Sequence, residues 1–209
     1  MADKAILIDT SKCMGCRGCQ VSCKQWWELP AVSTVNTGTY EIPSFSAQTW
    51  TTIRFKEVGR NGTVKWLFRK DQCLHCTKAV CVAVCPAYAR SYHPLGYVAI
   101  DQERCIGCGL CVAYCPFGIP KIGMHNVTRR ISVKIATPRR VAYNCRFCED
   151  RIADGLTPAC AKTCPTGAIQ FGERGELIEQ GRAGVKELQA KYPEVYLYGE
   201  EELGGLHVM

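Results

Sequence analysis

The sequence predicts an α+β chain made of two pseudo-symmetric modules, with an inserted β-hairpin and a C-terminal extension that contains a helix. Three observations predict this arrangement. The 209 residues include sixteen cysteines, which form four groups of four with none left over. The segment Ile8–Cys16 reappears in frame as Ile100–Cys108, which indicates an internal repeat. Residues 26–70, between the first and second groups, contain no cysteine and are rich in β-branched and aromatic residues.

The stretch from Cys105 to Pro116 indicates what the cysteines do. Three cysteines recur at every third residue with glycines between them, and Cys115 follows Cys111 by four residues and directly precedes the proline. This is the spacing of bacterial ferredoxins, in which the fourth cysteine ligates a neighbouring 4Fe–4S cluster. Clusters held in this way come in pairs. Four groups therefore predict two bacterial dicluster ferredoxin-like modules that hold four 4Fe–4S clusters.

All sixteen cysteines are candidate iron ligands. In chain order the groups are Cys13, Cys16, Cys19 and Cys23; Cys73, Cys76, Cys81 and Cys85; Cys105, Cys108, Cys111 and Cys115; and Cys145, Cys148, Cys160 and Cys164.

Two other uses of cysteine compete with this interpretation. Disulfide scaffolds are usually shorter secreted chains whose cysteines do not recur as triplets three residues apart. Zinc sites use paired Cys-x-x-Cys motifs, but they have no role for a third cysteine or for a proline after the last ligand. The fourth group fits zinc best, because eleven residues separate Cys148 from Cys160.

The chain order suggests which groups exchange their fourth cysteines. Cys19 and Cys23 are four residues apart, a rise of about 6 Å on a helix, so two clusters that they ligate would lie close together. Nearness in the chain pairs the second group with the third, and elimination pairs the first with the fourth. The predicted ligand sets are Cys13/Cys16/Cys19/Cys164, Cys145/Cys148/Cys160/Cys23, Cys73/Cys76/Cys81/Cys115 and Cys105/Cys108/Cys111/Cys85.

The domain boundaries follow from these pairings. Residues 1–25 with 140–175 are expected to form one module that holds two clusters, and residues 71–139 the other. Residues 26–70 form the inserted hairpin region, and residues 176–209 the C-terminal extension of a helix and strands.

Each secondary-structure element has a sequence signal. Short apolar strands are predicted at 5–9 and 97–101, directly before the first and third groups. Strands at 50–58 and 63–68 flank a Gly-Arg-Asn-Gly turn, which predicts the hairpin. A weak amphipathic pattern over 176–191, ended by Pro193, predicts a helix, and residues 194–209 are expected to be strands and turns.

The net charge of +7 has an internal explanation. A 4Fe–4S cluster with four thiolates carries about −2, so four clusters bring the holoprotein to roughly −1. We therefore interpret the basic excess as a counter-charge and expect no nucleic-acid partner. Lys12, Arg17, Lys24, Arg104 and Arg146 lie within or beside the ligand runs.

Four clusters that are each saturated by four cysteines leave no coordination site for a substrate, so the chain is expected to move electrons and to contain no catalytic residue. No apolar run is long enough to span a bilayer, and the first residues contain neither a twin arginine nor an apolar signal core. We expect no membrane span in this chain. Its location is then either extracytoplasmic, by export with a signal-bearing partner, or cytoplasmic.

Three runs carry a resemblance to a known family. They are the run from Cys13 to Trp26, the run from Trp66 to Cys76, and the run from Cys145 through Arg151 to Cys164-Pro165. The chain resembles the iron–sulfur β subunit of formate dehydrogenases and, more broadly, the four-cluster subunits of molybdopterin oxidoreductases. Relatives that serve dimethyl sulfoxide, polysulfide, nitrite, arsenate or aldehyde oxidoreductases share the ligand pattern. An independent polyferredoxin or a hydrogenase-linked electron carrier is the remaining alternative.

The resemblance implies a heteromer. A separate large subunit would hold a tungsten or molybdenum bis-pterin site and exchange electrons with this chain. The other partner would be a membrane cytochrome or quinone-binding subunit, a soluble cytochrome or a hydrogenase.

Overall fold

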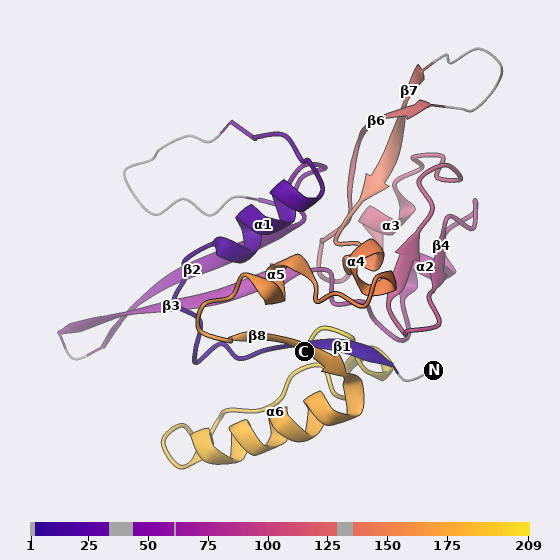
Figure 1. The fold of residues 1–209 in the computed structure, drawn as a ribbon. Helices are drawn as coiled ribbons and strands as arrows, with labels where there is room; N and C mark the ends of the chain where they lie inside the picture. The colour runs from indigo at the N-terminus through magenta and orange to yellow at the C-terminus, as the bar shows by residue number, and fades with distance from the viewer. Residues whose placement is uncertain (1–2, 34–43, 61, 129–135) are drawn as a thin grey trace.

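A computed structural model describes residues 3–33, 44–60, 62–128 and 136–209 (Figure 1). Helices and short two-stranded sheets alternate along the chain. In order they are β1 (Lys4–Ile8), α1 (Gly18–Trp26), β2 (Thr51–Arg60), β3 (Thr63–Gln72), α2 (Val80–Ala83), β4 (Arg90–Tyr92), β5 (Val98–Ile100), α3 (Leu110–Ala113), β6 (Lys121–Thr128), β7 (Ala136–Tyr143), α4 (Glu149–Ala153), α5 (Ala159–Lys162), β8 (Ile169–Glu173), α6 (Arg174–Gln189) and the 3₁₀ helix η1 (Glu202–Gly204).

Strand β1 pairs with β8, which brings the two ends of the chain together. The strands are antiparallel, with Lys4 opposite Glu173 and Ile8 opposite Ile169. The alternating apolar residues of β1 are buried on one side against α6, which contributes Leu177, and Met209 completes this small core. Because of this pairing, the first and fourth cysteine groups lie side by side although 121 or more residues separate them in the chain.

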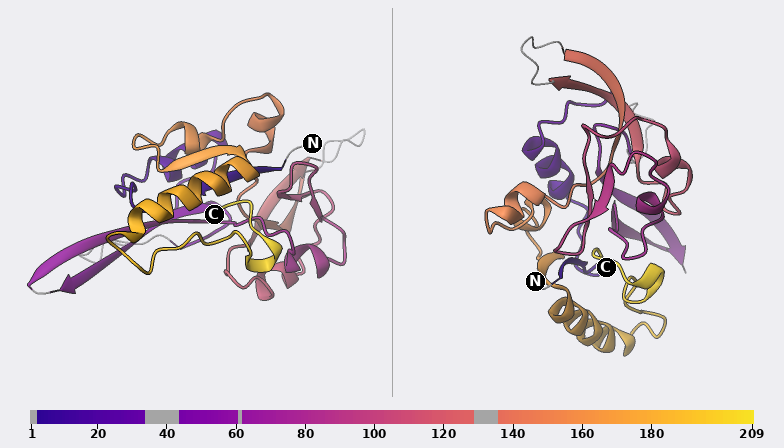
Figure 2. Two further views of the ribbon diagram at one scale, coloured as in Figure 1. Left: turned by 90° about the horizontal axis from the view of Figure 1, so that it is seen from below. Right: turned by 90° about the vertical axis from the view of Figure 1, so that its right-hand side faces the viewer.

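The hairpin β2–β3 extends away from the rest of the molecule, as the left view of Figure 2 shows. Both strands have ten residues, so they are longer than the predicted segments 50–58 and 63–68. Residue 61 of the predicted turn lies outside the described residues. The end of β3 near the body is buried, at Lys70 and Gln72, whereas its other half is exposed. The hairpin is therefore anchored only at its base.

A second hairpin, β6–β7, was not predicted from the sequence. Its antiparallel strands pair from Lys121 opposite Tyr143 to Thr128 opposite Ala136, and it projects beside α3 (Figure 1). Val141 and Ala142 at its base are buried against the third cysteine group. This hairpin supplies one wall of that group's cavity.

Each cysteine group places its third cysteine on a short helix. Cys19 lies on α1, Cys81 on α2, Cys111 on α3 and Cys160 on α5. The first two cysteines of a group lie on the loop before the helix, apart from Cys148, which caps α4. Each group therefore supplies sulfur atoms from both a loop and a helix.

The C-terminal extension differs in part from the expectation. Helix α6 covers residues 174–189 and buries Leu177 and Gly181. Residues 194–209 form turns and η1, with isolated bridges from Leu206 to Cys76 and from Val208 to Ile6 where strands were expected. Gly199, Gly204 and Gly205 have positive φ angles, which interrupt an extended strand.

Candidate functional site

The first cavity lies between the two ends of the chain. It is lined by Cys13, Cys16 and Cys19 from the loop after β1 and the start of α1, and by Cys164 from the loop after α5. Lys70 on β3 also contributes to the wall of this cavity. The structure therefore brings the first predicted ligand set together.

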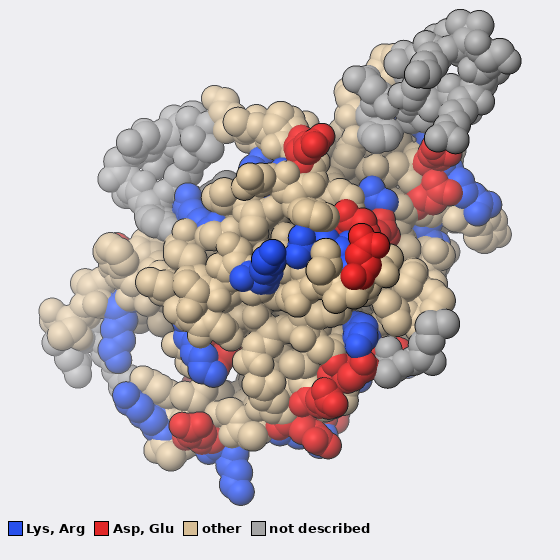
Figure 3. Space-filling model, viewed as in Figure 1, with Lys and Arg blue, Asp and Glu red and all other residues tan. Residues whose placement is uncertain are grey.

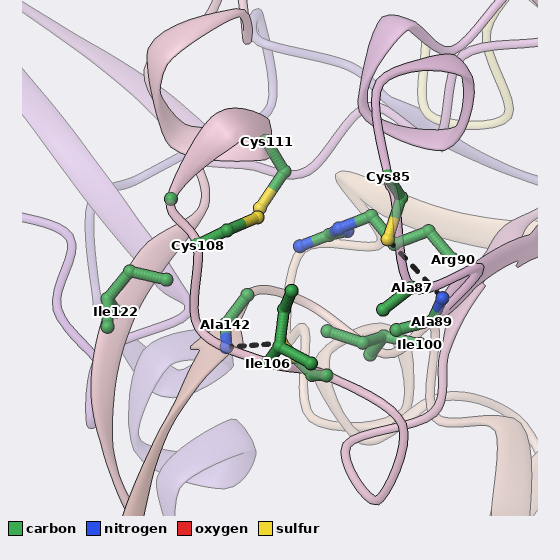
Figure 4. A pocket seen from close by; sticks show the side chains of 12 residues that line it. Cys85, Ala87, Ala89, Arg90, Ile100, Ile106, Cys108, Cys111, Ile122 and Ala142 are labelled. Carbon is green, nitrogen blue, oxygen red and sulfur yellow. Dashed lines mark hydrogen bonds between the residues drawn. The ribbon is translucent and has the colours of Figure 1, made fainter.

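A second cavity lies between α2, α3 and the base of β6–β7 (Figure 4). Cys105, Cys108 and Cys111 line it together with Cys85, which is the fourth predicted set. Two backbone N–H groups donate hydrogen bonds to its sulfurs. The bond from Ala89 N to Cys85 Sγ is 3.3 Å long and that from Ala142 N to Cys105 Sγ is 3.4 Å. Such donors stabilise negative charge on cluster sulfur.

The cysteines of the two remaining sets are buried or partly buried. Cys23 is surrounded electrostatically by Cys145, Cys148 and Cys160. In the other set, Cys81 and Cys115 are neighbours of Cys76, and Cys81 is also a neighbour of Cys73. Cys23 thus faces the fourth group across the chain, while its own helix carries Cys19 into the first cavity.

Electrostatic interactions show which of the predicted sets are neighbours. Cys160 of the second predicted set raises the pKa of Cys19 in the first, after burial and together with the other cysteines of its own set. Cys73 contributes in the same way at Cys145, and Cys111 at Cys81. These pairs link the predicted Cys13 set to the Cys145 set, the Cys145 set to the Cys73 set, and the Cys73 set to the Cys105 set. Of the sixteen cysteines, only Cys16 and Cys108 are exposed, and they belong to the two end sets.

Burial determines the protonation of most interior thiols. It raises the pKa of Cys19, Cys76 and Cys148 to about 11, and that of Cys73 to about 12. The nearby thiolates raise these values further, because like charges disfavour each other's ionisation. Without a positively charged centre, these cysteines are neutral at physiological pH.

Two buried cations at the site, Lys70 and Arg90, are not among the basic residues that the sequence indicates within or beside the ligand runs. Lys70 and Arg90 are 5% and 4% exposed. At Lys70, burial lowers the pKa, but the thiolates of Cys160, Cys19, Cys145 and Cys23 outweigh it and raise the pKa above its ordinary value. At Arg90, burial is likewise outweighed by Cys111, Cys81 and Cys73. The alternation of β3 was the available signal, since it places Phe68, Lys70 and Gln72 on one face.

The donor sets suit iron–sulfur clusters. Soft thiolates select iron–sulfur centres, and four sulfurs surround each cavity. Among the described residues, no three Cys, His, Asp or Glu side chains are grouped as a site for a single metal ion.

The surface carries charges of both signs. On the face in Figure 3, basic and acidic side chains are interspersed and do not form one large basic area. In the part of the chain that the structure describes, no helix combines the length and apolar character needed to cross a membrane.

Comparisons with known proteins identify the same cofactor. Residues 12–89 and 64–174 each match a 4Fe–4S dicluster domain family. Two such domains imply four 4Fe–4S clusters, which the sixteen cysteines fit.

Relatives that match along nearly all of this chain are named as formate dehydrogenase subunits. The nitrate-inducible formate dehydrogenase iron–sulfur subunit of Escherichia coli (strain K12) is 42% identical over all of this chain and 67% of its own length. The formate dehydrogenase subunit beta of Megalodesulfovibrio gigas is 33% identical over 96% of this chain and 90% of its own. The formate dehydrogenase 2 subunit beta (cytochrome c-553) of Nitratidesulfovibrio vulgaris is 32% identical over 99% and 93%. The chain thus spans about two thirds of the E. coli relative and nearly all of the other two.

Proposed function

Because the chain belongs to the family of formate dehydrogenase iron–sulfur subunits, we propose that it relays electrons through four 4Fe–4S clusters held in a row. One end of the row receives electrons from a bis-pterin tungsten or molybdenum catalytic subunit that oxidises formate. The other end delivers them to a downstream redox partner. The clusters supply one-electron chemistry, and the protein supplies their ligands, spacing and surroundings.

The four proposed ligand sets are the sets of four cysteines that the sequence predicts. The first cavity would be filled by a cluster on Cys13, Cys16, Cys19 and Cys164, and the second by one on Cys105, Cys108, Cys111 and Cys85. Cys23 would complete the cluster of Cys145, Cys148 and Cys160, and Cys115 that of Cys73, Cys76 and Cys81. The electrostatic neighbours of Cys23 and Cys76 support these two sets.

We also propose the division into modules. Residues 1–25 with 140–175 form one dicluster module, which the β1–β8 pairing supports, and residues 71–139 form the other. Each module then holds one end cluster and one central cluster, and the two halves are related by pseudo-symmetry.

The exposure of the cysteines supports the proposed ends of the row. Cys16 and Cys108 are the two exposed cysteines, and they belong to opposite ends. Each follows an exposed apolar residue at the same place in its loop, Met14 with 58% exposure and Ile106 with 64%. Exposed apolar side chains beside a redox centre suit contact with another protein. We assign these loops as the places where electrons enter and leave.

The partners follow from the relatives. The formate dehydrogenase names support a catalytic subunit, and the name of the N. vulgaris relative supports a cytochrome as the downstream partner. In this arrangement the pterin and its metal belong to the catalytic subunit alone.

The test uses the assembled complex, purified without oxygen. Formate should bleach the visible absorption of the oxidised clusters and produce the electron paramagnetic resonance (EPR) signals of reduced ones. Either Cys16→Ser or Cys108→Ser should slow transfer from formate to the downstream acceptor at least tenfold. A small dye that accepts electrons directly from the catalytic subunit is the internal control, and its reduction should be unchanged. Clusters that formate leaves oxidised, while dimethyl sulfoxide or nitrite reoxidises the reduced complex, would assign the chain to another pterin oxidoreductase.

A further inference from the structure

Two positive side chains are buried among the cysteines, where an uncompensated charge is unfavourable. Removing an ammonium or guanidinium group from water costs several kcal/mol unless opposite charge and hydrogen bonds compensate. Lys70 and Arg90 are almost completely buried. None of the ion pairs found among the described residues includes either of them. Under the proposed function, the negatively charged clusters held by the cysteine sets compensate them.

Lys70 lies between the two sets of the first module. It is on β3 opposite Ile53 and lines the cavity of the Cys13 set. Its charge acts on Cys19 of that set and on Cys23, Cys145 and Cys160 of the next. Its ammonium group donates a hydrogen bond to Oε1 of Gln72, which holds the side chain in place.

Arg90 has the corresponding position in the second module. It is on β4, and Figure 4 shows its side chain extending into the cavity between Cys85 and the pair Cys108 and Cys111. Its charge also acts on Cys73 and Cys81 of the adjacent set. Nη2 donates a 2.9 Å hydrogen bond to Oδ1 of Asn144, whereas Nη1 is buried without a hydrogen-bond partner among the described residues. The Arg90 side chain also interacts with the thiol of Cys111, which lines this cavity.

A third buried cation shows the contrast. The Nε of Arg151 donates to the backbone oxygen of Thr157 at 2.7 Å, and its guanidinium lies 4.3 Å from the centre of the Trp26 ring. These contacts account for its position. Lys70 and Arg90 instead face two cysteine sets each.

We propose that Lys70 and Arg90 are positioning charges that raise the reduction potentials of the two clusters on either side of them. The inference rests on the proposed function. Reduction adds one electron to a cluster, with no bond broken and no proton taken up, so its negative charge increases by one. A fixed positive charge in a region of low dielectric constant stabilises that increase. Because each cation adjoins both sets of a module, it acts on the two potentials together.

The central experiment replaces Lys70 by Met, whose apolar side chain fills most of the same space. The assembled complex is titrated anaerobically, and EPR spectra report the oxidised and reduced fractions of each cluster. At a fixed solution potential, we expect the ratio of reduced to oxidised forms to fall about tenfold for the Cys13 and Cys145 clusters. For a one-electron couple this is a midpoint lowered by about 59 mV. The other two clusters should be unchanged.

Three further variants make the result specific. Lys70→Arg keeps the charge and should retain most of the original potential. Lys65→Met removes a lysine from the exposed half of the same strand and should shift no cluster. Arg90→Met should lower the potentials of the Cys73 and Cys105 clusters and leave the first module unchanged.

Iron content decides how each titration is interpreted. Lys70→Met with full iron content and four unchanged potentials would overturn the inference, as would equal shifts in all four clusters. If Lys70→Met loses iron, Lys70→Gln provides a second neutral variant. Iron loss in both neutral variants but not in Lys70→Arg supports the need for the charge, whereas loss in all three contradicts it. The proposed function fails separately, if formate reduces no cluster of the unaltered complex.

Discussion

The side chains of His75 and Phe147 meet at a steep angle, with ring centroids 4.9 Å apart and ring planes inclined by 69°. Each is the third residue of a Cys-x-x-Cys loop, His75 before Cys76 and Phe147 before Cys148. Both are fully buried, and Tyr97 stacks on Phe147 with centroids 4.9 Å apart. The Cys73–Cys76 and Cys145–Cys148 loops are therefore joined by an aromatic contact.

This contact requires an unusual backbone. All four loops have a positive φ at that residue, 71° at Gly15, 48° at His75, 68° at Gly107 and 58° at Phe147. The loops of the first and third cysteine groups have glycine at this position, for which the conformation is free of strain. Those of the second and fourth groups have His75 and Phe147, for which it costs about 1–2 kcal/mol. Burial of the rings offsets that cost.

At Phe147, the glycine variant should be more stable than the alanine variant, which reverses the usual order of stability. Phe147→Ala is expected to lower the free energy of unfolding by about 3–5 kcal/mol, since a buried ring is lost. Phe147→Gly loses the same ring but also relieves the backbone strain, which the alanine variant keeps, so we expect it to be about 1 kcal/mol more stable than the alanine variant. Denaturant titration of the anaerobic protein, followed by cluster absorption, measures both. Phe171 on β8 is the control, and there alanine should be the more stable. If alanine is the more stable variant at both positions, the backbone of Phe147 is not strained.

Gly107 and Gly109 separate crowding from backbone strain within one loop. Both have positive φ, but a Cβ on Gly107 would lie 2.4 Å from the backbone oxygen of Arg140, whereas nothing lies within 4 Å of one on Gly109. Gly109→Ala should cost about 1–2 kcal/mol and leave the iron content intact. Gly107→Ala should in addition displace β7 from the loop and lose about a quarter of the iron. Equal iron content in the two variants, measured per chain, would show that the loop yields to the clash.

Local spacing explains what the sequence could predict. The cysteine groups, the repeat and the strand before each repeated loop are encoded within about ten residues, so the pattern is readable without the fold. The first hairpin was also predicted, because its strands carry alternating β-branched and aromatic residues. Family membership follows from the same local runs.

The features that were missed depend on residues distant in the chain. Strands β6 and β7 include Gly123, Pro138 and two arginines and lack an apolar alternation, and a two-stranded sheet tolerates the proline at its edge. Lys70 is buried only because the base of its hairpin packs against cysteine sets from both ends of the chain. The alternation of β3 places Lys70 on the face of Phe68, but the exposed Trp66 shares that face, so alternation alone does not predict the burial of Lys70.

Cluster loading should depend on pH in a definite direction. Iron binds thiolates, but burial raises the pKa of Cys19, Cys76 and Cys148 to about 11, so near neutral pH the iron-free sites carry protons. The loaded state binds fewer protons than the empty one, and therefore higher pH favours loading. With a fixed concentration of competing chelator, the iron held per chain should rise from about pH 6 to about pH 9. Proton release on reconstitution in weak buffer is the companion measurement. A flat pH profile without proton release would contradict the burial of neutral thiols.

Exchange of the fourth cysteines between the first and last groups gives the strictest test of the ligand sets. Cys23 follows Cys19 on α1, yet its electrostatic neighbours are Cys145, Cys148 and Cys160, while Cys164 lines the cavity of the Cys13 set. Cys23→Ser should therefore damage the Cys145 cluster, and Cys164→Ser the Cys13 cluster, each with loss of up to about a quarter of the iron. EPR and Mössbauer spectra of the two variants should differ, because the damaged cluster is central in one and terminal in the other. A small oxidant should reach the terminal cluster faster, since Cys16 is exposed and Cys148 and Cys160 are buried. If Cys23→Ser alters the Cys13 cluster alone, the first group ligates its own cluster and the two ends of the chain are joined by β1 and β8 without shared ligands.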